Sequence, residues 1–233
     1  MSAAQSFMGL IGTSAAVRDL NSDISIAAAQ PVGVLISGEP GVGKHFVARL
    51  LHHQSRVFIS VCCSNQSEAW LERALFDSVK GALIVGNGAT VYLSEVGQLS
   101  ALLQRRLLEF IDARAMRAPR AVRLIAATST PLVGDDSGPC FREDLYYRLN
   151  TVHLAIPALR ERHEDVEPLM EYFAAGEATR RRVPLPRVTR SVRVAFSRYQ
   201  WPGNVRELKE ATEALVRGSG RGSGPQVLTP AVH

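Results

Sequence analysis

The sequence predicts an α/β protein in which a mostly parallel five-stranded sheet is flanked by helices and followed by a small helical part. Up to about residue 165, short apolar runs alternate with amphipathic stretches of helical period. Strands that alternate with helices form parallel sheets covered on both faces. Beyond this point only helical patterns follow, and the chain ends in "GSGRGSGPQ", a flexible composition. We therefore expect an α/β core over 1–165, a helical subdomain over 166–217 and a flexible tail over 218–233.

Each element has a local signal. The strands are apolar runs of strand length, and the helices carry apolar residues at helical spacing. Thr13 or Ser14 can cap the first helix, and Thr189 a later one. The expected strands are 32–37, 57–63, 89–96, 121–129 and 151–156. The expected helices are 14–29, 44–54, 67–76, 100–114, 142–149, 163–178, 190–199 and 204–217.

The composition is that of an ordinary globular protein, with 46% hydrophobic residues and mean hydropathy near zero. No apolar run reaches the roughly 18–20 residues of a membrane span, and the N-terminus lacks the pattern of a signal peptide. A cytoplasmic location is the default expectation. Adjacent Cys62 and Cys63 on one strand point to opposite faces, which argues against a zinc pair and favours buried thiols. The net charge of +5 suits a nucleic-acid surface, but no zinc-finger spacing or aromatic RNA-binding motif supports one.

The strongest motif is "GEPGVGKH", which stands between an expected strand and an expected helix. Its glycines let backbone N–H groups curl around phosphates, and its lysine reaches the β- and γ-phosphate oxygens. The motif predicts a site for ATP or ADP. The hydroxyl that usually binds Mg²⁺ is replaced by His45. The candidate nucleotide-binding residues are Gly38, Glu39, Gly41, Val42, Gly43, Lys44 and His45.

A second motif, "TVYLSEV", has the pattern of the strand that carries the acidic residues of an ATPase. A carboxylate at position 94 would hold the water shell of Mg²⁺, and the next residue would position the attacking water. Glu95 fits the second role. Ser94 stands at the metal position, but it is neutral and short, so we expect Mg²⁺ to be held weakly.

Together with "ALFDSVKGA", "VRLIAATS", "FREDLYYRLN", "LRERHEDV" and "YQWPGNVREL", these segments resemble the AAA+ domain of bacterial sigma-54-dependent transcription activators. The resemblance covers roughly residues 8–230. It implies a P-loop AAA+ core with a C-terminal helical lid. It also implies assembly into a ring, commonly hexameric, with nucleotide between neighbouring subunits.

The resemblance assigns roles to further residues. Arg142 and Arg148 match the arginines that reach into the neighbouring subunit's site, and Arg206 matches the lid arginine that contacts nucleotide in its own subunit. Guanidinium groups suit these roles because they stay charged and fork onto phosphate oxygens. Ser129 stands where the family usually has an asparagine that reads the γ-phosphate, and Thr128 beside it matches.

The sequence also departs from the family. Cys62 replaces an asparagine that gates the catalytic glutamate, and a thiol is only a weak donor. The sigma-contacting GAFTGA loop is absent, since only "LIVGNGA" (83–89) follows Ala82, and "AMRAPRA" shortens a second insertion. No sensory domain precedes residue 8 and no helix-turn-helix follows residue 217, so we expect no DNA-binding domain.

These features favour a nucleotide-binding regulatory subunit with weak or absent hydrolysis. It would join itself or a full-length sigma-54 activator in a ring and act on sigma-54 RNA polymerase only indirectly. One alternative is an active ATPase that remodels sigma-54 polymerase by itself. Another is a regulatory binding module outside sigma-54 transcription. ATP turnover by the purified chain separates the first two hypotheses.

Overall fold

The computed structural model describes residues 9–30, 32–52, 57–78, 80–85, 89–115, 122–133 and 141–219. These residues form two compact units. The α/β unit contains Leu20–Glu39 and Lys44–Ile156, whereas the helical unit contains Leu10–Asp19, Pro40–Gly43 and the chain from Pro157 onward. The helical unit thus begins nine residues before the boundary expected at 166, and it includes four residues of the glycine-rich motif.

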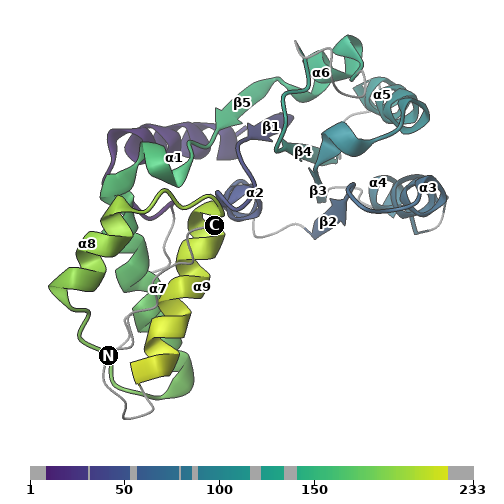
Figure 1. Ribbon diagram of the computed structural model, residues 1–233. Helices are drawn as coiled ribbons and strands as arrows, with labels where there is room; N and C mark the ends of the chain where they lie inside the picture. Colours follow the sequence, from purple (N-terminus) through teal and green to yellow (C-terminus); the bar gives the residue numbers. More distant parts are fainter. Residues whose placement is uncertain are drawn as a thin grey trace. The chain divides into compact units, whose positions relative to one another are not determined.

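The α/β unit is built on a sheet of five parallel strands, which confirms the fold class (Figure 1). The strands lie in the order β2-β3-β4-β1-β5. The central residues of β1, β3 and β4 are buried and apolar, as expected for strands covered on both faces, whereas β2 and β5 at the two edges are partly exposed. The bounds are β1 (Val34–Ser37), β2 (Phe58–Cys62), β3 (Thr90–Ser94), β4 (Arg123–Thr128) and β5 (Val152–Ala155).

The strand register brings polar residues together at the carboxyl edge of the sheet. Cys62 at the end of β2 is paired with Ser94 at the end of β3, and Ser37 at the end of β1 is paired with Thr128 at the end of β4. Ligands of open α/β sheets bind at this edge. The topology therefore places the residues that follow β1, β3 and β4 in one region.

The helices confirm most of the sequence expectations and add the short α4 and three 3₁₀ turns, Val96–Gln98, Leu159–Glu161 and His163–Asp165. They are α1 (Ala15–Ala28), α2 (Lys44–Leu50), α3 (Glu68–Phe76), α4 (Ala82–Val85), α5 (Ala101–Ala115) and α6 (Glu143–Leu149). Helix α2 ends four residues earlier than expected, because the His52 N–H bonds to Arg49 O in a tighter turn. The single-turn α4 takes up part of the shortened 83–89 connection, and residues 86–88 and 116–121 lie outside the described part of the chain.

The helical unit contains α7 (Val166–Arg181), α8 (Arg190–Arg198) and α9 (Asn204–Ser219), with α7 and α9 side by side (Figure 1). Trp201 is the centre of its core, where Phe196 and Tyr199 contact it edge-on and Phe196 O accepts its indole N–H at 2.9 Å. The buried members of this core are Leu159, Val166, Leu169, Met170, Trp201 and Leu208. Helix α9 continues through Gly218 and Ser219, and the rest of the expected tail, 220–233, lies outside the described residues. Among the helices described, none is long and apolar enough to cross a membrane.

Candidate nucleotide-binding site

The lysine of the glycine-rich motif is buried at the first turn of α2. Only 8% of its side chain is exposed. Its ammonium donates to Gly38 O at 2.7 Å, to Glu39 O at 3.1 Å and to Ser129 Oγ at 2.6 Å. These contacts hold Nζ at the carboxyl edge of the sheet, where a phosphate group would replace some of its acceptors. Lys44 thus lies at the edge where ligands of such sheets bind, and its role in binding phosphate stays a prediction.

Ser129 joins Lys44 to Glu95. Its hydroxyl accepts from Lys44 and donates to Glu95 Oε1 at 2.7 Å, while its backbone N–H donates to Glu95 Oε2 at 2.9 Å. Glu95 Oε1 also lies 3.7 Å from Lys44 Nζ. Glu95 adopts a left-handed conformation with φ of 54°, which turns the chain directly after β3. Three residues predicted separately therefore form one network, and both carboxylate oxygens of Glu95 accept hydrogen bonds within it.

A cavity of about 430 Å³ opens beside this network in the α/β unit. Its lining includes Ser37, Glu39 and Ser129, which stand at or just after the carboxyl ends of β1 and β4. His153 also lines the cavity, and its Nε2 lies 2.8 Å from Ser37 Oγ. The carboxyl edge of the sheet, where this cavity lies, is the usual place for ligands in an open α/β sheet.

Three of the residues that depart from the family pattern, His45, Cys62 and Ser94, lie on or against one face of the β2–β3 pair. The His45 imidazole packs edge-on against the rings of Tyr92 and Phe58, with centroids 5.3 and 5.8 Å apart. Tyr92 and Ser94 share this face because side chains alternate along a strand. On the paired strand, Cys62 lies beside Ser94 in register, and its thiol is 3.2 Å from Ser64 Oγ. The side chain at position 45, where a metal-binding hydroxyl is usual, therefore packs against aromatic rings.

The pKa values of His45, Cys62 and Cys63 are shifted by different causes. Burial, followed by the positive charge of Arg49, lowers the pKa of His45, so its imidazole is neutral at physiological pH. The hydrogen bond with the Ser64 side chain is the main cause that lowers the pKa of the exposed Cys62 thiol. Burial raises the pKa of the neighbouring Cys63 to about 12. The expectation of a buried thiol is confirmed for Cys63 and wrong for Cys62, because Cys62 stands at the exposed carboxyl end of β2.

The two predicted ring arginines lie on or next to α6 and are exposed. Arg142 forms a forked ion pair with Asp144, with nitrogen–oxygen distances of 3.0 and 2.6 Å. Arg148 lies 3.0 Å from Asp112 Oδ1. Both side chains are at the surface, and more than 40% of each is exposed. The ion pairs orient the guanidinium groups without burying them.

The remaining predicted residues lie in the helical unit. Gly41 adopts a φ of 83°, and its carbonyl accepts the backbone N–H of Arg206 at 3.2 Å. A Cβ atom at Gly41 would stand 2.2 Å from Gly203 O, so only glycine fits there. The side chain of Arg206 is exposed near the start of α9. The glycine-rich motif of residues 38–45, called the phosphate loop below, is thus joined to the lid arginine Arg206 by a backbone hydrogen bond.

Asp165 is a buried residue to which the sequence analysis gave no role, although it stands in "LRERHEDV". Its carboxylate is fully buried and accepts from Thr13 N at 2.6 Å, Ser14 N at 2.8 Å and Ser14 Oγ at 2.7 Å. Ser14 Oγ in turn accepts the N–H of Val17 and so caps α1. The acidic position within the motif was the available signal.

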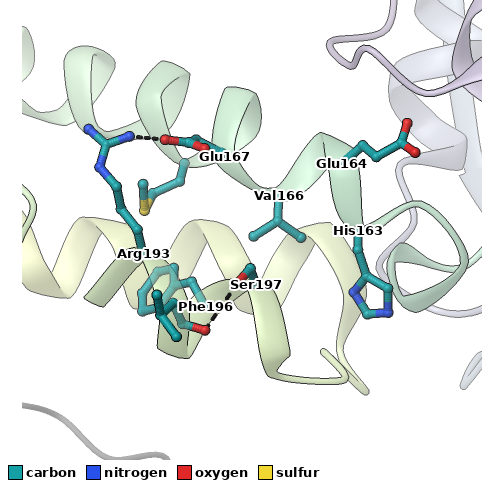
Figure 2. A pocket seen from close by; sticks show the side chains of 9 residues that line it. His163, Glu164, Val166, Glu167, Arg193, Phe196 and Ser197 are labelled. Atoms are coloured by element: carbon teal, nitrogen blue, oxygen red, sulfur yellow. Dashed lines mark hydrogen bonds and ion pairs between the residues drawn. The ribbon is translucent and has the colours of Figure 1, made fainter. Parts of the chain in front are cut away.

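A second cavity, of about 270 Å³, lies in the helical unit between α7 and α8 (Figure 2). Figure 2 shows Arg193 directed toward Glu167, with Val166 and Phe196 facing the cavity. Glu164 and Glu167 on its rim would repel a phosphate group. Its lining contains none of the residues predicted to bind nucleotide, so we do not assign nucleotide binding to it.

Two models of known protein families match the sequence of this chain. The model of the sigma-54 interaction domain matches residues 10–155, and the model of an AAA+ ATPase lid domain matches residues 160–223. The chain belongs to the sigma-54 interaction domain family. The lid match begins close to Pro157, where the helical unit begins.

Relatives of this sigma-54 interaction domain are transcription regulators. It is 39% identical over 230 residues to the transcriptional regulatory protein ZraR of Klebsiella oxytoca, a match that covers 89% of this chain and 52% of the relative. It is 36% identical to the anaerobic nitric oxide reductase transcription regulator NorR of Klebsiella pneumoniae, over 96% of this chain and 48% of the relative. The chain spans about half the length of the curated relatives it matches.

Solved structures support the same fold. NtrX from Brucella abortus in complex with ATP superposes with a TM-score of 0.85 at 30% identity, over 93% of this chain and 52% of that one. The Holliday junction branch migration motor RuvB from Thermotoga maritima has a TM-score of 0.59 at 16% identity over 90% of this chain and 64% of that one, which shows a shared fold alone.

Proposed function

We propose that this sigma-54 interaction domain binds ATP or ADP and acts as a regulatory subunit in transcription control. It assembles in a ring, with itself or with an intact activator, and hydrolyses ATP slowly or not at all. The observation that carries the proposal is the network of Lys44, Ser129 and Glu95 beside the phosphate loop. The solved NtrX complexes with ADP and ATP support nucleotide binding by this fold.

Slow hydrolysis follows from how Glu95 is held. A residue that positions an attacking water needs an acceptor directed at that water. Both oxygens of Glu95 already accept hydrogen bonds from Ser129, and Lys44 lies close to one of them. Ser129 occupies one acceptor site on each oxygen and fixes the direction of the carboxylate. We infer that Glu95 held in this way positions an attacking water poorly, so that bound ATP persists.

The residues present do not fit a Mg²⁺ ion bound in the usual way. Such a site needs a hydroxyl after the lysine and a carboxylate at the end of the second strand. His45 packs against aromatic rings instead, and Ser94, which has no carboxylate, is paired with Cys62 on the neighbouring strand. Within the part of the chain that the structure describes, no group of three or more His, Cys, Asp or Glu side chains is placed to hold a metal. We therefore infer that nucleotide affinity depends little on Mg²⁺.

Restoring the missing acid should create that dependence. In the wild-type chain we expect ADP affinity to change less than threefold between EDTA and excess Mg²⁺, whereas Ser94→Asp should bind ADP roughly tenfold more tightly with Mg²⁺ than without it. Fluorescence titration with a labelled ADP measures both affinities. Ser60→Asp, on the same strand face as Cys62 but farther from the sheet's carboxyl edge, is the matched control. A strong Mg²⁺ dependence of the wild type would contradict this assignment.

The exposed arginines support a role in assembly. Arg142 and Arg148 extend from the α6 region with their charges at the surface. A subunit of this kind can supply arginines to a neighbour's nucleotide while its own site turns over slowly. Its effect would then fall on the activator with which it assembles.

The proposal is tested with the purified chain alone and mixed with a full-length sigma-54 activator. ATP turnover and particle mass are measured in both samples. We expect ADP binding with little turnover alone, and a changed turnover and a larger particle in the mixture. Brisk turnover by the chain alone would refute the regulatory role, and an absence of ADP binding would refute the nucleotide site.

A further inference from the structure

Three successive carbonyl groups of the phosphate loop accept hydrogen bonds from donors in the helical unit. Pro40 O accepts from Asn204 Nδ2 at 3.0 Å, and Gly41 O accepts from Arg206 N at 3.2 Å. Val42 O lies at the longer distance of 3.5 Å from Arg162 Nη2. All of these residues belong to the same compact unit.

These contacts also fix the direction of three N–H groups. A trans peptide is planar, so the carbonyl of one residue and the N–H of the next point in opposite directions. Donors that hold the carbonyls of residues 40–42 therefore turn the N–H groups of Gly41, Val42 and Gly43 away from themselves. Successive N–H groups of this kind form the concave surface that binds phosphate.

Asn204 is the side chain built into this arrangement. It is fully buried, with φ of 54°, a conformation that asparagine tolerates better than most residues. Its Oδ1 accepts from Leu159 N at 2.8 Å while its Nδ2 donates to Pro40 O. Because one partner is a backbone donor and the other a backbone acceptor, the orientation of the amide is unambiguous.

We propose that Asn204 is a positioning residue that presets the N–H groups of residues 41–43 for the phosphates of a nucleotide. The inference rests on the proposed nucleotide binding and goes beyond it. It assigns the shape of the phosphate loop to a side chain 164 positions away in the lid. The lid then takes part in phosphate recognition through its hydrogen bonds to the loop carbonyls as well as through the side chain of Arg206.

The test compares ADP with adenosine, which lacks phosphate. Asn204→Asp keeps the acceptor for Leu159 but removes the donor to Pro40, and Asn204→Gly removes both the donor and the acceptor without adding charge. Both replacements tolerate the left-handed backbone. We expect each variant to bind ADP about tenfold more weakly, because the loss of one hydrogen bond that orients the loop changes affinity by about this factor. The affinity for adenosine should change less than threefold. Competition against a fluorescent ADP measures both ligands.

The control is Thr212→Val, which removes a buried hydrogen bond to Leu208 O elsewhere in α9. It should leave both affinities unchanged. Equal losses for ADP and adenosine in the Asn204 variants would mean that Asn204 only supports the lid, and unchanged ADP affinity would also overturn the proposal. A wild-type chain that binds no ADP would refute the nucleotide site itself, and this inference with it.

Thermal unfolding establishes first that the variants fold. Should both fail to fold, the side-chain amide resonances of Asn204 in the wild-type chain are followed by NMR. We expect them to shift on ADP binding and to stay in place with adenosine. No shift with ADP would overturn the proposal.

Discussion

Replacing Lys44 by alanine should weaken the binding of ADP and ATP about 100-fold, because a charged hydrogen-bond donor to phosphate is lost from a partly buried site. Lys44 is held by two loop carbonyls and by Ser129, so its ammonium is already fixed where the phosphates would lie. Titration with a fluorescent ADP measures the loss. An affinity unchanged by this substitution would disprove the phosphate-loop assignment.

Lys80→Ala provides the matched control for charge. Lys80 is an exposed lysine of the same unit, and it carries the same charge away from the network. It should change ADP affinity less than twofold, since exposed charges are screened by salt. A loss shared by both variants would point to general electrostatic attraction rather than to a built site.

Replacing Asp165 by alanine should lower the free energy of unfolding by about 3–5 kcal/mol, because a buried carboxylate that accepts three hydrogen bonds is removed. The substitution leaves the N–H groups of Thr13 and Ser14 without this acceptor. It also removes a negative charge that offsets the buried guanidinium of Arg162. Urea unfolding followed by circular dichroism measures the change.

Two further variants sharpen the test of Asp165. Asp165→Asn keeps one carbonyl acceptor, so its loss should be smaller than that of the alanine variant. Glu164→Ala changes the exposed neighbouring acid and should alter the unfolding free energy by less than about 0.5 kcal/mol. If Asp165→Ala were no more destabilised than Glu164→Ala, the buried carboxylate would not be the anchor of residues 13 and 14.

The departures from the family pattern form one connected change. His45 contacts Tyr92, Tyr92 and Ser94 share a strand face, and Ser94 meets Cys62 on the paired strand. The His45 imidazole, at the position of a usual metal-binding hydroxyl, packs against the rings of Tyr92 and Phe58. We infer that these replacements adapt the site together, so that nucleotide is retained without the usual metal-assisted hydrolysis.

Much of the fold follows from local signals. The five apolar runs became the five strands, and Thr189 caps α8 as expected, with its hydroxyl accepting from Val192 N. Caps and strand periodicity depend on neighbouring residues, so they can be read from the sequence. The single-turn α4 was not predicted, because four residues carry too little periodicity to distinguish a helix from a loop.

By itself the sequence determined the phosphate-loop motif, the parallel sheet and the replaced positions 45, 62 and 94, since each depends on residue type and short spacing. Only the tertiary structure decided what these residues touch. Ser129 reaches Lys44 across 85 positions and Asn204 reaches Pro40 across 164. Such contacts arise from strand order and from the packing of the helical unit, which set the distances between segments far apart in the chain. The sequence predicted residue types and short spacings. The hydrogen bonds that hold Glu95 and those that shape the phosphate loop depend on the folded molecule.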